Sequence, residues 1–408
     1  MNLRNTIAFG AAAASSLALA FCGTAALAQP APSAPPISKT PAAVLFWTQA
    51  QKEAGFQSME TRFNVHVVKH GETVKPLPAG APLAVAVVRD GKTQPLEDFM
   101  AAQKTAGLLV IQDGRIRLER YALGYGPDKR WTSFSVAKSV TSTLVGAAIR
   151  DGYIKSLDDP VTQYIPGLRG SAYEGVSVRQ LLTMTSGVKW NEDYTDPNSD
   201  VARLFSVAPD PGMDPTVSYM RKLPRETAPG AKWVYKTGET NLIGVLVTSA
   251  THKTLADYLS EKVWRPYGMQ ADAAWMVDER GQEAGGCCLS VSLRDYGRIG
   301  LFVMGGGAAG GRPVVPDGWF AAATHKQTGI GQPGYGYGYQ WWTNDDGTFD
   351  ALGIFGQRIH IDPARKLVVV VSSAWPEADV LERNLASDAL VASIAAAVDA
   401  QPQPKGRP

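Results

Sequence analysis

Cysteine is scarce in this chain of 408 residues, which contains only Cys22, Cys287 and Cys288. Because Cys287 and Cys288 are adjacent, they cannot link distant segments, so a fold held together by a disulfide framework is excluded. Two arrangements stay open for this pair: two buried thiols, or a disulfide between neighbouring residues. In either case the stability of the fold must come from its hydrophobic core.

An excess of charge of one sign is also lacking, because 40 Lys and Arg residues are balanced by 38 Asp and Glu residues, for a formal net charge of +2. Such a chain has no long-range field that would steer a polyanion, and we expect no nucleic-acid partner. The hydrophobic content of 45% and the charged content of 19% are ordinary for a globular protein and exclude a disordered or fibrous one.

The first 28 residues have the pattern of a secretory signal peptide. Arg4 precedes an apolar run over residues 7–21, and Ala26-Leu27-Ala28 is an A-x-A cleavage site. The run is too short and too weakly hydrophobic for a stable membrane span. We therefore expect cleavage after Ala28 and a periplasmic or secreted mature protein that is not held at a membrane.

The remaining chain is predicted to have three parts. Residues 29–105 form a linker, rich in Pro, Ala and Ser at its start, followed by an N-terminal extension. Residues 106–400 form the main domain, and residues 401–408 form a tail.

Strand patterns mark the two ends of the main domain. Alternating apolar residues on both sides of Asp113-Gly114 predict a hairpin over 108–121. Helical patterns dominate residues 151–290. Strands are further predicted at 339–343, 357–361 and 367–373, and helices at 46–59, 136–150, 178–185, 241–250, 255–263, 293–304 and 381–398. This order predicts an α/β fold of the α+β type, with one antiparallel sheet from both chain ends, flanking helices and an inserted helical region.

Ser135 is the candidate nucleophile, in the sequence Ser135-Val136-Ala137-Lys138 at the start of a predicted helix. Residues three apart share a helix face, so the hydroxyl of Ser135 and the amine of Lys138 can come within hydrogen-bond distance. A serine hydroxyl needs a neighbouring base, and a buried lysine can be that base because burial disfavours its charge. Ser-x-x-Lys is common by chance, but its position after a predicted hairpin favours a catalytic pair.

Tyr235 is the second candidate, in the sequence Tyr235-Lys236-Thr237-Gly238 before an apolar helix. A neighbouring lysine ammonium can stabilise a phenolate or let a phenol relay a proton, so Tyr235 would pair with Lys138. The alternative is a core tyrosine whose hydroxyl is bonded elsewhere.

The order of these motifs resembles that of the serine β-lactamase, penicillin-binding protein and esterase superfamily, whose members carry Ser-x-x-Lys, then Tyr-x-Asn or Tyr-x-Ser, then a late strand with Lys-Thr-Gly or its substitute. The similarity extends from about Ala106 to the last helix. The stretches most similar to the 6-aminohexanoate-dimer hydrolase branch are Leu181 to Gly187, Trp190 to Pro197, Gly285 to Arg298, Gly336 to Trp342 and Gly353 to Gln357.

This resemblance implies a role for each matching residue. Ser135 would be the acylated nucleophile, Lys138 the acceptor of its proton, and Tyr235 the acid that protonates the leaving group. The backbone N–H of Ser135 and that of Gly356 or Gln357 would form the oxyanion hole. Tyr194 matches a tyrosine on a loop that closes over the substrate, and no metal or organic cofactor is implied.

The late strand departs from the pattern of the penicillin-recognising members. It carries Phe355-Gly356-Gln357, without a cation to hold a β-lactam carboxylate. Arg358 follows, but strand alternation turns it to the face opposite to Gln357. The literal Lys236-Thr237-Gly238 lies in the tyrosine motif before a helix and cannot also be the strand motif. These departures favour a small amide or ester as the substrate.

An aromatic run near the late strand has two interpretations. It could form an apolar substrate wall, with Trp341 as a binding residue, or pack a sheet face against helices. The run consists of Tyr335, Tyr337, Tyr339, Trp341 and Trp342.

Other classes of function fit this sequence less well. No Gly-x-Ser-x-Gly motif of a Ser-His-Asp hydrolase occurs. His66 and His70 are four apart but lie in a predicted strand, so we expect no metal site. The main alternatives are a class C-type β-lactamase or a DD-peptidase, and then a non-catalytic ligand-binding module of the same fold. The sequence indicates no oligomeric state.

Overall fold

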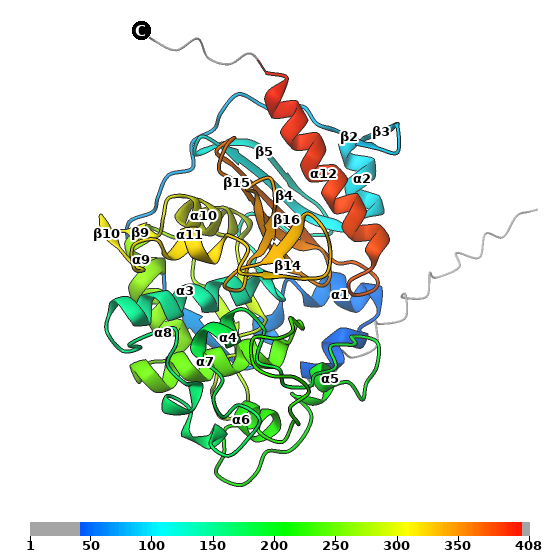
Figure 1. Cartoon of the computed structure of the whole chain (residues 1–408). Helices are drawn as coiled ribbons and strands as arrows, with labels where there is room; N and C mark the ends of the chain where they lie inside the picture. The colour runs from blue at the N-terminus through cyan, green and yellow to red at the C-terminus, as the bar shows by residue number, and fades with distance from the viewer. Residues whose placement is uncertain (1–40, 402–408) are drawn as a thin grey trace, which may run out of the picture. The chain divides into compact units, whose positions relative to one another are not determined.

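A large antiparallel sheet with helices on both faces forms the upper half of the view in Figure 1. The computed structural model describes residues 41–401, so the predicted signal peptide, most of the linker and nearly all of the tail lie outside the described residues. Within residues 41–401, no helix combines the length and the apolar character needed to cross a membrane.

Both ends of the main domain contribute strands to this eight-stranded sheet, whose order is β11-β12-β13-β14-β15-β16-β4-β5. The predicted hairpin is confirmed: β4 (Thr105–Gln112) and β5 (Arg115–Tyr121) pair across Asp113-Gly114, and both turn residues have positive φ, as this turn requires. β16 (Leu367–Ser373) lies beside β4. The other strands are β11 (Thr328–Gly329), β12 (Tyr335–Tyr337), β13 (Trp342–Asn344), β14 (Phe349–Gly353) and β15 (Gln357–Asp362).

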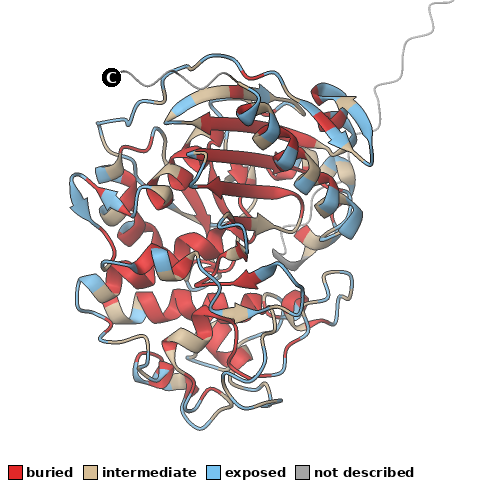
Figure 2. Ribbon diagram, turned by 45° about the horizontal axis from the view of Figure 1, so that its top comes forward, coloured by how far each residue is buried: buried red, intermediate tan, exposed pale blue. Residues whose placement is uncertain are grey.

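Alternation along the central strands divides the core into two layers. Leu108 and Val110 of β4 pack with α12 (Leu381–Asp399) and α2 (Leu96–Ala102) on one face. Leu109 and Ile111 face the other side, where α10 (Leu293–Met304) covers β4, β15 and β16. Figure 2 shows the result: central strands buried on both faces beneath helices whose outer surfaces are exposed. The predicted fold class is therefore confirmed.

Glycine allows α10 to approach the sheet closely. A Cβ atom at Gly300 would lie 2.5 Å from Val368, and one at Gly297 would lie 2.6 Å from Ile111. Larger residues at these positions would push the helix away from the sheet and open voids between them.

A smaller sheet, of order β1-β7-β8-β6, leads into the helical region. Its strands are β1 (Val65–Val68), β7 (Ala273–Met276), β8 (Leu289–Val291) and β6 (Trp131–Thr132). β6 directly precedes α3 (Val136–Arg150), a helix almost entirely buried, which packs along α7 (Thr237–Thr251). The helical region thus places the starts of α3 and α7 close together.

The remaining elements are short. They are η1 (Pro41–Phe46), α1 (Gln49–Gly55), η2 (Met59–Thr61), β2 (Ala86–Arg89), β3 (Lys92–Pro95), η3 (Val161–Gln163), η4 (Pro166–Leu168), α4 (Val178–Leu182), α5 (Asp200–Arg203), α6 (Pro215–Met220), α8 (Leu255–Leu259), the π-helix η5 (Ser260–Trp264), α9 (Arg265–Tyr267), β9 (Ala308–Ala309), β10 (Arg312–Pro313) and α11 (Trp319–Ala323).

Several predicted boundaries were wrong, among them the ends of the helices expected over 178–185 and 255–263, which lie at Leu182 and Leu259. The helix expected over 46–59 is reduced to α1, because the capping box of Thr48 and Gln51 starts it late. α7 begins four residues before the predicted 241. The strand expected at 339–343 begins at Trp342, because Gln340 has a φ of 63° and turns the chain.

Candidate active site

Ser135 lies at the N-terminus of α3, with 8% of its surface exposed. The residue before it, Phe134, has a φ of 42°, which is strained for a bulky side chain. The Phe134 ring is held by Phe56 at 4.8 Å and Phe355 at 4.9 Å between centroids. This aromatic packing fixes the sharp turn that presents the Ser135 hydroxyl at the start of the helix.

Lys138 is buried one helical turn along from Ser135. Its Nζ donates to Thr237 Oγ1 at 3.0 Å and to the Gly286 carbonyl at 2.7 Å. Burial lowers the pKa of Lys138 to about 8, and the nearby Glu192 carboxylate opposes this shift. A neutral amine has two N–H bonds, which match these two acceptors, and its lone pair is then free to accept a proton.

Tyr235 approaches the pair from the segment before α7. Its ring centroid lies 5.2 Å from Lys138 Nζ, and its hydroxyl is near enough to the Ser135 side chain for that side chain to affect its pKa. Burial and the Glu192 charge raise the pKa of Tyr235 well above its ordinary value, although the Ser135 side chain acts in the opposite direction. The structure therefore brings together all three residues that the sequence singled out, with Tyr235 as a protonated phenol.

Glu192 is a member of the site that sequence reasoning missed. It accepts hydrogen bonds from the Thr237 N–H at 2.9 Å, the Thr237 hydroxyl, the Tyr194 hydroxyl at 2.8 Å and Trp190 Nε1. Four donors fill the acceptor capacity of a carboxylate. Because the Thr237 hydroxyl donates to Glu192, its oxygen is oriented to accept from Lys138.

The loop 285–288 forms one wall of the site and is held from two helices. Thr141 of α3 donates to the Gly285 carbonyl at 2.7 Å, and Asn241 of α7 accepts from the Gly286 N–H at 2.9 Å. Cys287 and Cys288 form a disulfide, which decides between the two arrangements left open by the sequence. Lys138 is thus bonded to a carbonyl that is itself fixed in place.

A pocket of about 50 Å³ opens beside Ser135. Most of its lining is apolar. The residues that line it are Val44, Leu45, Phe134, Ser135, Tyr194, Val201, Phe205, Thr237, Met276, Gly286, Cys287, Cys288 and Ile354.

The backbone near the predicted oxyanion hole is arranged differently from the expectation. The Gly356 N–H donates to the Gly353 carbonyl at 3.1 Å, and Gln357 pairs with Gly353 in the β14–β15 ladder. Within residues 41–401, the N–H groups of Ser135 and Ile354 make no hydrogen bond, and both residues line the pocket. A Cβ at Gly353 would lie 2.8 Å from the Ser133 carbonyl, so the end of β14 lies against the segment leading to Ser135.

The two predicted substrate-binding residues lie in different environments. Tyr194 lines the pocket. The structure does not bring Trp341 to the site, because its ring is buried against Phe349 at 5.4 Å. The next residue, Trp342, begins β13, and its ring stacks on that of Tyr235 at 5.5 Å between centroids.

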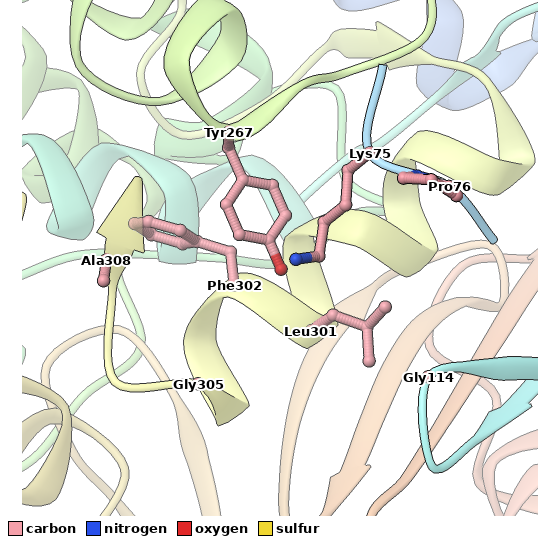
Figure 3. A pocket seen from close by; sticks show the side chains of 8 residues that line it. All are labelled: Lys75, Pro76, Gly114, Tyr267, Leu301, Phe302, Gly305 and Ala308. Atoms are coloured by element: carbon pink, nitrogen blue, oxygen red, sulfur yellow. The ribbon is translucent and has the colours of Figure 1, made fainter. Parts of the chain in front are cut away.

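A larger pocket of about 310 Å³ lies elsewhere, beside α9 and α10 (Figure 3). Lys75 and Tyr267 face each other there, with the Lys75 ammonium 4.8 Å from the centroid of the Tyr267 ring. None of the three candidate catalytic residues lines this pocket, so the smaller pocket beside Ser135 is the candidate active site.

Comparison with known proteins agrees with this geometry. The profile of the beta-lactamase family matches residues 93–392. The 6-aminohexanoate-dimer hydrolase of Paenarthrobacter ureafaciens is 30% identical over 321 residues, which cover 75% of this chain and 81% of that protein.

Solved structures show the same fold. A candidate 6-aminohexanoate-dimer hydrolase from Bacillus anthracis superposes with a TM-score of 0.78 at 24% identity, covering 86% of this chain and 95% of that one. A class C beta-lactamase from Rhodobacter sphaeroides has a TM-score of 0.55 at 20% identity, covering 73% and 97%. The resemblance predicted from the sequence is confirmed, and the chain belongs to the beta-lactamase family of serine hydrolases, which act on amides or esters.

Proposed function

We propose that this protein is an exported serine hydrolase that cleaves small amides or esters through an acyl-enzyme on Ser135. The observation that carries the proposal is the convergence of three groups: a serine hydroxyl, a buried lysine whose pKa is lowered to about 8, and a tyrosine whose ring centroid lies 5.2 Å from the lysine Nζ. Nucleophile, base and acid are the groups that acyl transfer requires. Similarity to the 6-aminohexanoate-dimer hydrolase of P. ureafaciens supports a small amide or ester as the substrate.

In the acylation step the neutral amine of Lys138 accepts the proton of the Ser135 hydroxyl. The Ser135 Oγ bonds to the substrate carbonyl carbon, and the carbonyl oxygen becomes an oxyanion. The N–H groups of Ser135 and Ile354 both lack another acceptor within residues 41–401, so they are the proposed oxyanion-hole donors. Such donors stabilise charge that develops only in the transition state.

Collapse of the tetrahedral intermediate breaks the bond to the leaving group, which takes the proton of the Tyr235 hydroxyl. The raised pKa of Tyr235 supports this role, because the phenol stays protonated at neutral pH. The Lys138 ammonium then returns a proton to the phenolate. Water attacks the acyl-enzyme with the same groups acting in reverse, which releases the acid and restores Ser135.

The β-lactamase and DD-peptidase alternatives rank lower because the late strand offers no free cation. Arg358 forms ion pairs with Asp350 at 2.7 Å and with Asp388 of α12 at 2.7 Å, on the sheet face opposite to Gln357. A chromogenic cephalosporin, a linear aminohexanoate dimer and short acyl esters should be compared in one assay. Faster turnover of the cephalosporin would reverse this ranking.

Replacing the nucleophile tests the assignment. Ser135→Ala should abolish turnover and labelling by a fluorophosphonate probe. Ser142→Ala is the matched control, because Ser142 lies on the same buried helix but its hydroxyl donates to the Tyr339 carbonyl at 2.7 Å. Hydrolysis by Ser135→Ala at the wild-type rate would refute the assignment.

Export is the part of the proposal that rests on sequence alone. Expression with the full N-terminus should yield a mature chain that starts at Gln29 in the periplasm or medium. N-terminal sequencing that finds Met1 retained in the cytoplasm would contradict export, and it would leave the proposed chemistry standing.

A further inference from the structure

We infer that the pocket beside Ser135 binds the acyl part of the substrate and accepts a short, uncharged acyl group. This inference rests on the proposed function, because it assumes that Ser135 is the residue acylated. It narrows the substrate class to amides or esters whose acid is small and apolar.

The position of Tyr235 decides which half of the substrate enters the pocket. Ser135 lines the pocket and Tyr235 does not. Because Tyr235 is the proposed proton donor to the leaving group, that group must lie on the Tyr235 side. There Tyr235 contacts an aromatic cluster that includes Trp342 at 5.5 Å and Tyr337 at 6.2 Å. The pocket, which Ser135 lines and Tyr235 does not, is left for the acyl group.

Segments far apart in the sequence supply the apolar walls of this acyl pocket. Val44 and Leu45 come from η1, and Val201 comes from α5, which contacts η1. Phe205 follows α5, and Met276 comes from β7. These side chains offer no hydrogen-bond donor or charge, so an acyl chain placed among them is held by its apolar surface alone.

Charged groups near the pocket are already occupied or lie outside it. The Glu192 carboxylate accepts from four donors. Lys138 donates to Thr237 and Gly286. Asp379 is exposed, accepts from Asn384 at 2.9 Å, and does not line the pocket, although its charge reaches Tyr235 and Tyr194. An ionised group at the end of the acyl chain would therefore be desolvated without a counter-ion.

The volume limits the length of the acyl chain. A single water needs about 10–15 Å³, and a pocket of about 50 Å³ fits a group of a few heavy atoms better than a long chain. A butyryl group is of this size.

Two nitrophenyl esters test the inference directly. p-Nitrophenyl butyrate and p-nitrophenyl 3-aminopropionate have acyl chains of equal length, with a terminal methyl in one and an ammonium in the other at pH 7. Each kcat/KM is divided by the rate constant for hydroxide hydrolysis of the same ester, which removes the difference in intrinsic reactivity. We expect the wild-type protein to prefer butyrate at least tenfold. Equal corrected values, or a preference for the ammonium, would overturn the inference.

Neighbouring substitutions in η1 provide a matched pair. Leu45 lines the pocket, whereas Phe46 is 47% exposed and does not. Leu45→Asp places a carboxylate in the pocket wall. The ratio of the corrected kcat/KM for butyrate to that for 3-aminopropionate should then fall at least fivefold. Phe46→Asp should keep the wild-type preference. An unchanged preference in a folded, active Leu45→Asp protein would count against the acyl pocket.

The outcomes separate this inference from the proposed function. If both esters are hydrolysed equally and Ser135→Ala abolishes both activities, the acyl pocket is wrong and the serine hydrolase stands. If Ser135→Ala keeps its activity, the proposed function itself fails. If Leu45→Asp does not fold, Leu45→Ala serves instead: enlarging the pocket should raise kcat/KM for p-nitrophenyl hexanoate relative to butyrate, and no change in that ratio would refute the inference.

Discussion

Glu192 binds Thr237 at two points, accepting from both its backbone N–H and its hydroxyl. This double contact joins the loop that carries Tyr194 to the first turn of α7. It also orients the Thr237 hydroxyl oxygen, which accepts a hydrogen bond from Lys138 Nζ at 3.0 Å. A carboxylate with no hydrogen bond to Ser135 or Tyr235 therefore affects the pKa of the proposed base, opposing the larger effect of burial.

The first prediction concerns the pH dependence of activity. Lys138 must be neutral to accept a proton, so kcat/KM should rise with pH through an apparent pKa near 8. Glu192 raises the pKa of Lys138, and Glu192→Gln removes its negative charge while keeping its shape. The pKa of Lys138 should then fall, and the rising limb of the kcat/KM profile should move to lower pH.

Asp193→Asn is the control for this shift. Asp193 is the exposed neighbour of Glu192, and its carboxylate accepts from Thr195 instead of Thr237. Asp193→Asn should keep the wild-type dependence of kcat/KM on pH. A rising limb that moves to higher pH in Glu192→Gln, or does not move, would contradict the electrostatic role of Glu192.

The second prediction concerns the leaving group. Tyr235→Phe removes the proposed proton donor and keeps the ring that stacks on Trp342. Hydrolysis of an anilide, whose leaving group must be protonated, should fall by about 10²- to 10⁴-fold. The kcat/KM for a p-nitrophenyl ester, which includes only the steps up to acylation, should fall far less, because p-nitrophenolate leaves without a proton.

Tyr337→Phe removes a hydroxyl from the same aromatic cluster and should leave the ratio of anilide to ester activity unchanged. Equal losses on both substrates in Tyr235→Phe would show that Tyr235 only positions other groups.

The third prediction concerns the disulfide between Cys287 and Cys288. Both residues line the pocket, and Gly286, directly before them, accepts from Lys138. Cys288 has a φ of 67°, a conformation that bulky residues keep only when their surroundings impose it. Reduction should therefore loosen this wall and lower kcat/KM several-fold, with the loss measured against the number of thiols released. The Cys287→Ser, Cys288→Ser double variant should not respond to reductant. Full activity after release of both thiols would refute the proposed dependence of kcat/KM on this disulfide.

The fourth prediction concerns stability. Asp350 lies buried in the sheet and bonds Arg358 at 2.7 Å and His360 at 2.9 Å. Although burial disfavours its charge, these two partners hold the pKa of Asp350 below its ordinary value. Asp350→Asn leaves Arg358 without its buried counter-ion and should lower the free energy of unfolding by about 3–5 kcal/mol. Asp346→Asn, at an exposed position in the same hairpin, should cost less than about 1 kcal/mol in the same urea titration. Equal losses of unfolding free energy in the two variants would contradict the stabilising role of the buried Asp350–Arg358 pair.

Local pattern explains which parts of the fold could be predicted. The hairpin at Asp113-Gly114 and the helix that follows Ser135 have strong periodicity and clear ends, and the structure has them where they were expected. The first turn of α7 was missed because Thr237 and Gly238 are weak helix formers, and burial against α3 overrides that preference.

Tertiary contacts explain what the sequence could not predict about the site. Ser135 and Lys138 were found because their spacing puts them on one helix face. Glu192 lies in a loop, and its importance depends on contact with Thr237, which is 45 residues away in the chain. Ile354, and not Gly356, is the proposed oxyanion-hole donor because of where the β14–β15 ladder ends, and the sequence does not show that position. Leu45 lies in a segment that the sequence described only as an extension.

The central claim is that Ser135 carries the acyl group during turnover, and trapping that intermediate tests it most directly. The protein should be mixed with p-nitrophenyl butyrate, quenched in acid during the steady state, digested and examined by mass spectrometry. The account predicts a butyryl group on the peptide that contains Ser135, and none on the same peptide from Ser135→Ala. A butyryl group on a different residue of the active protein would contradict it.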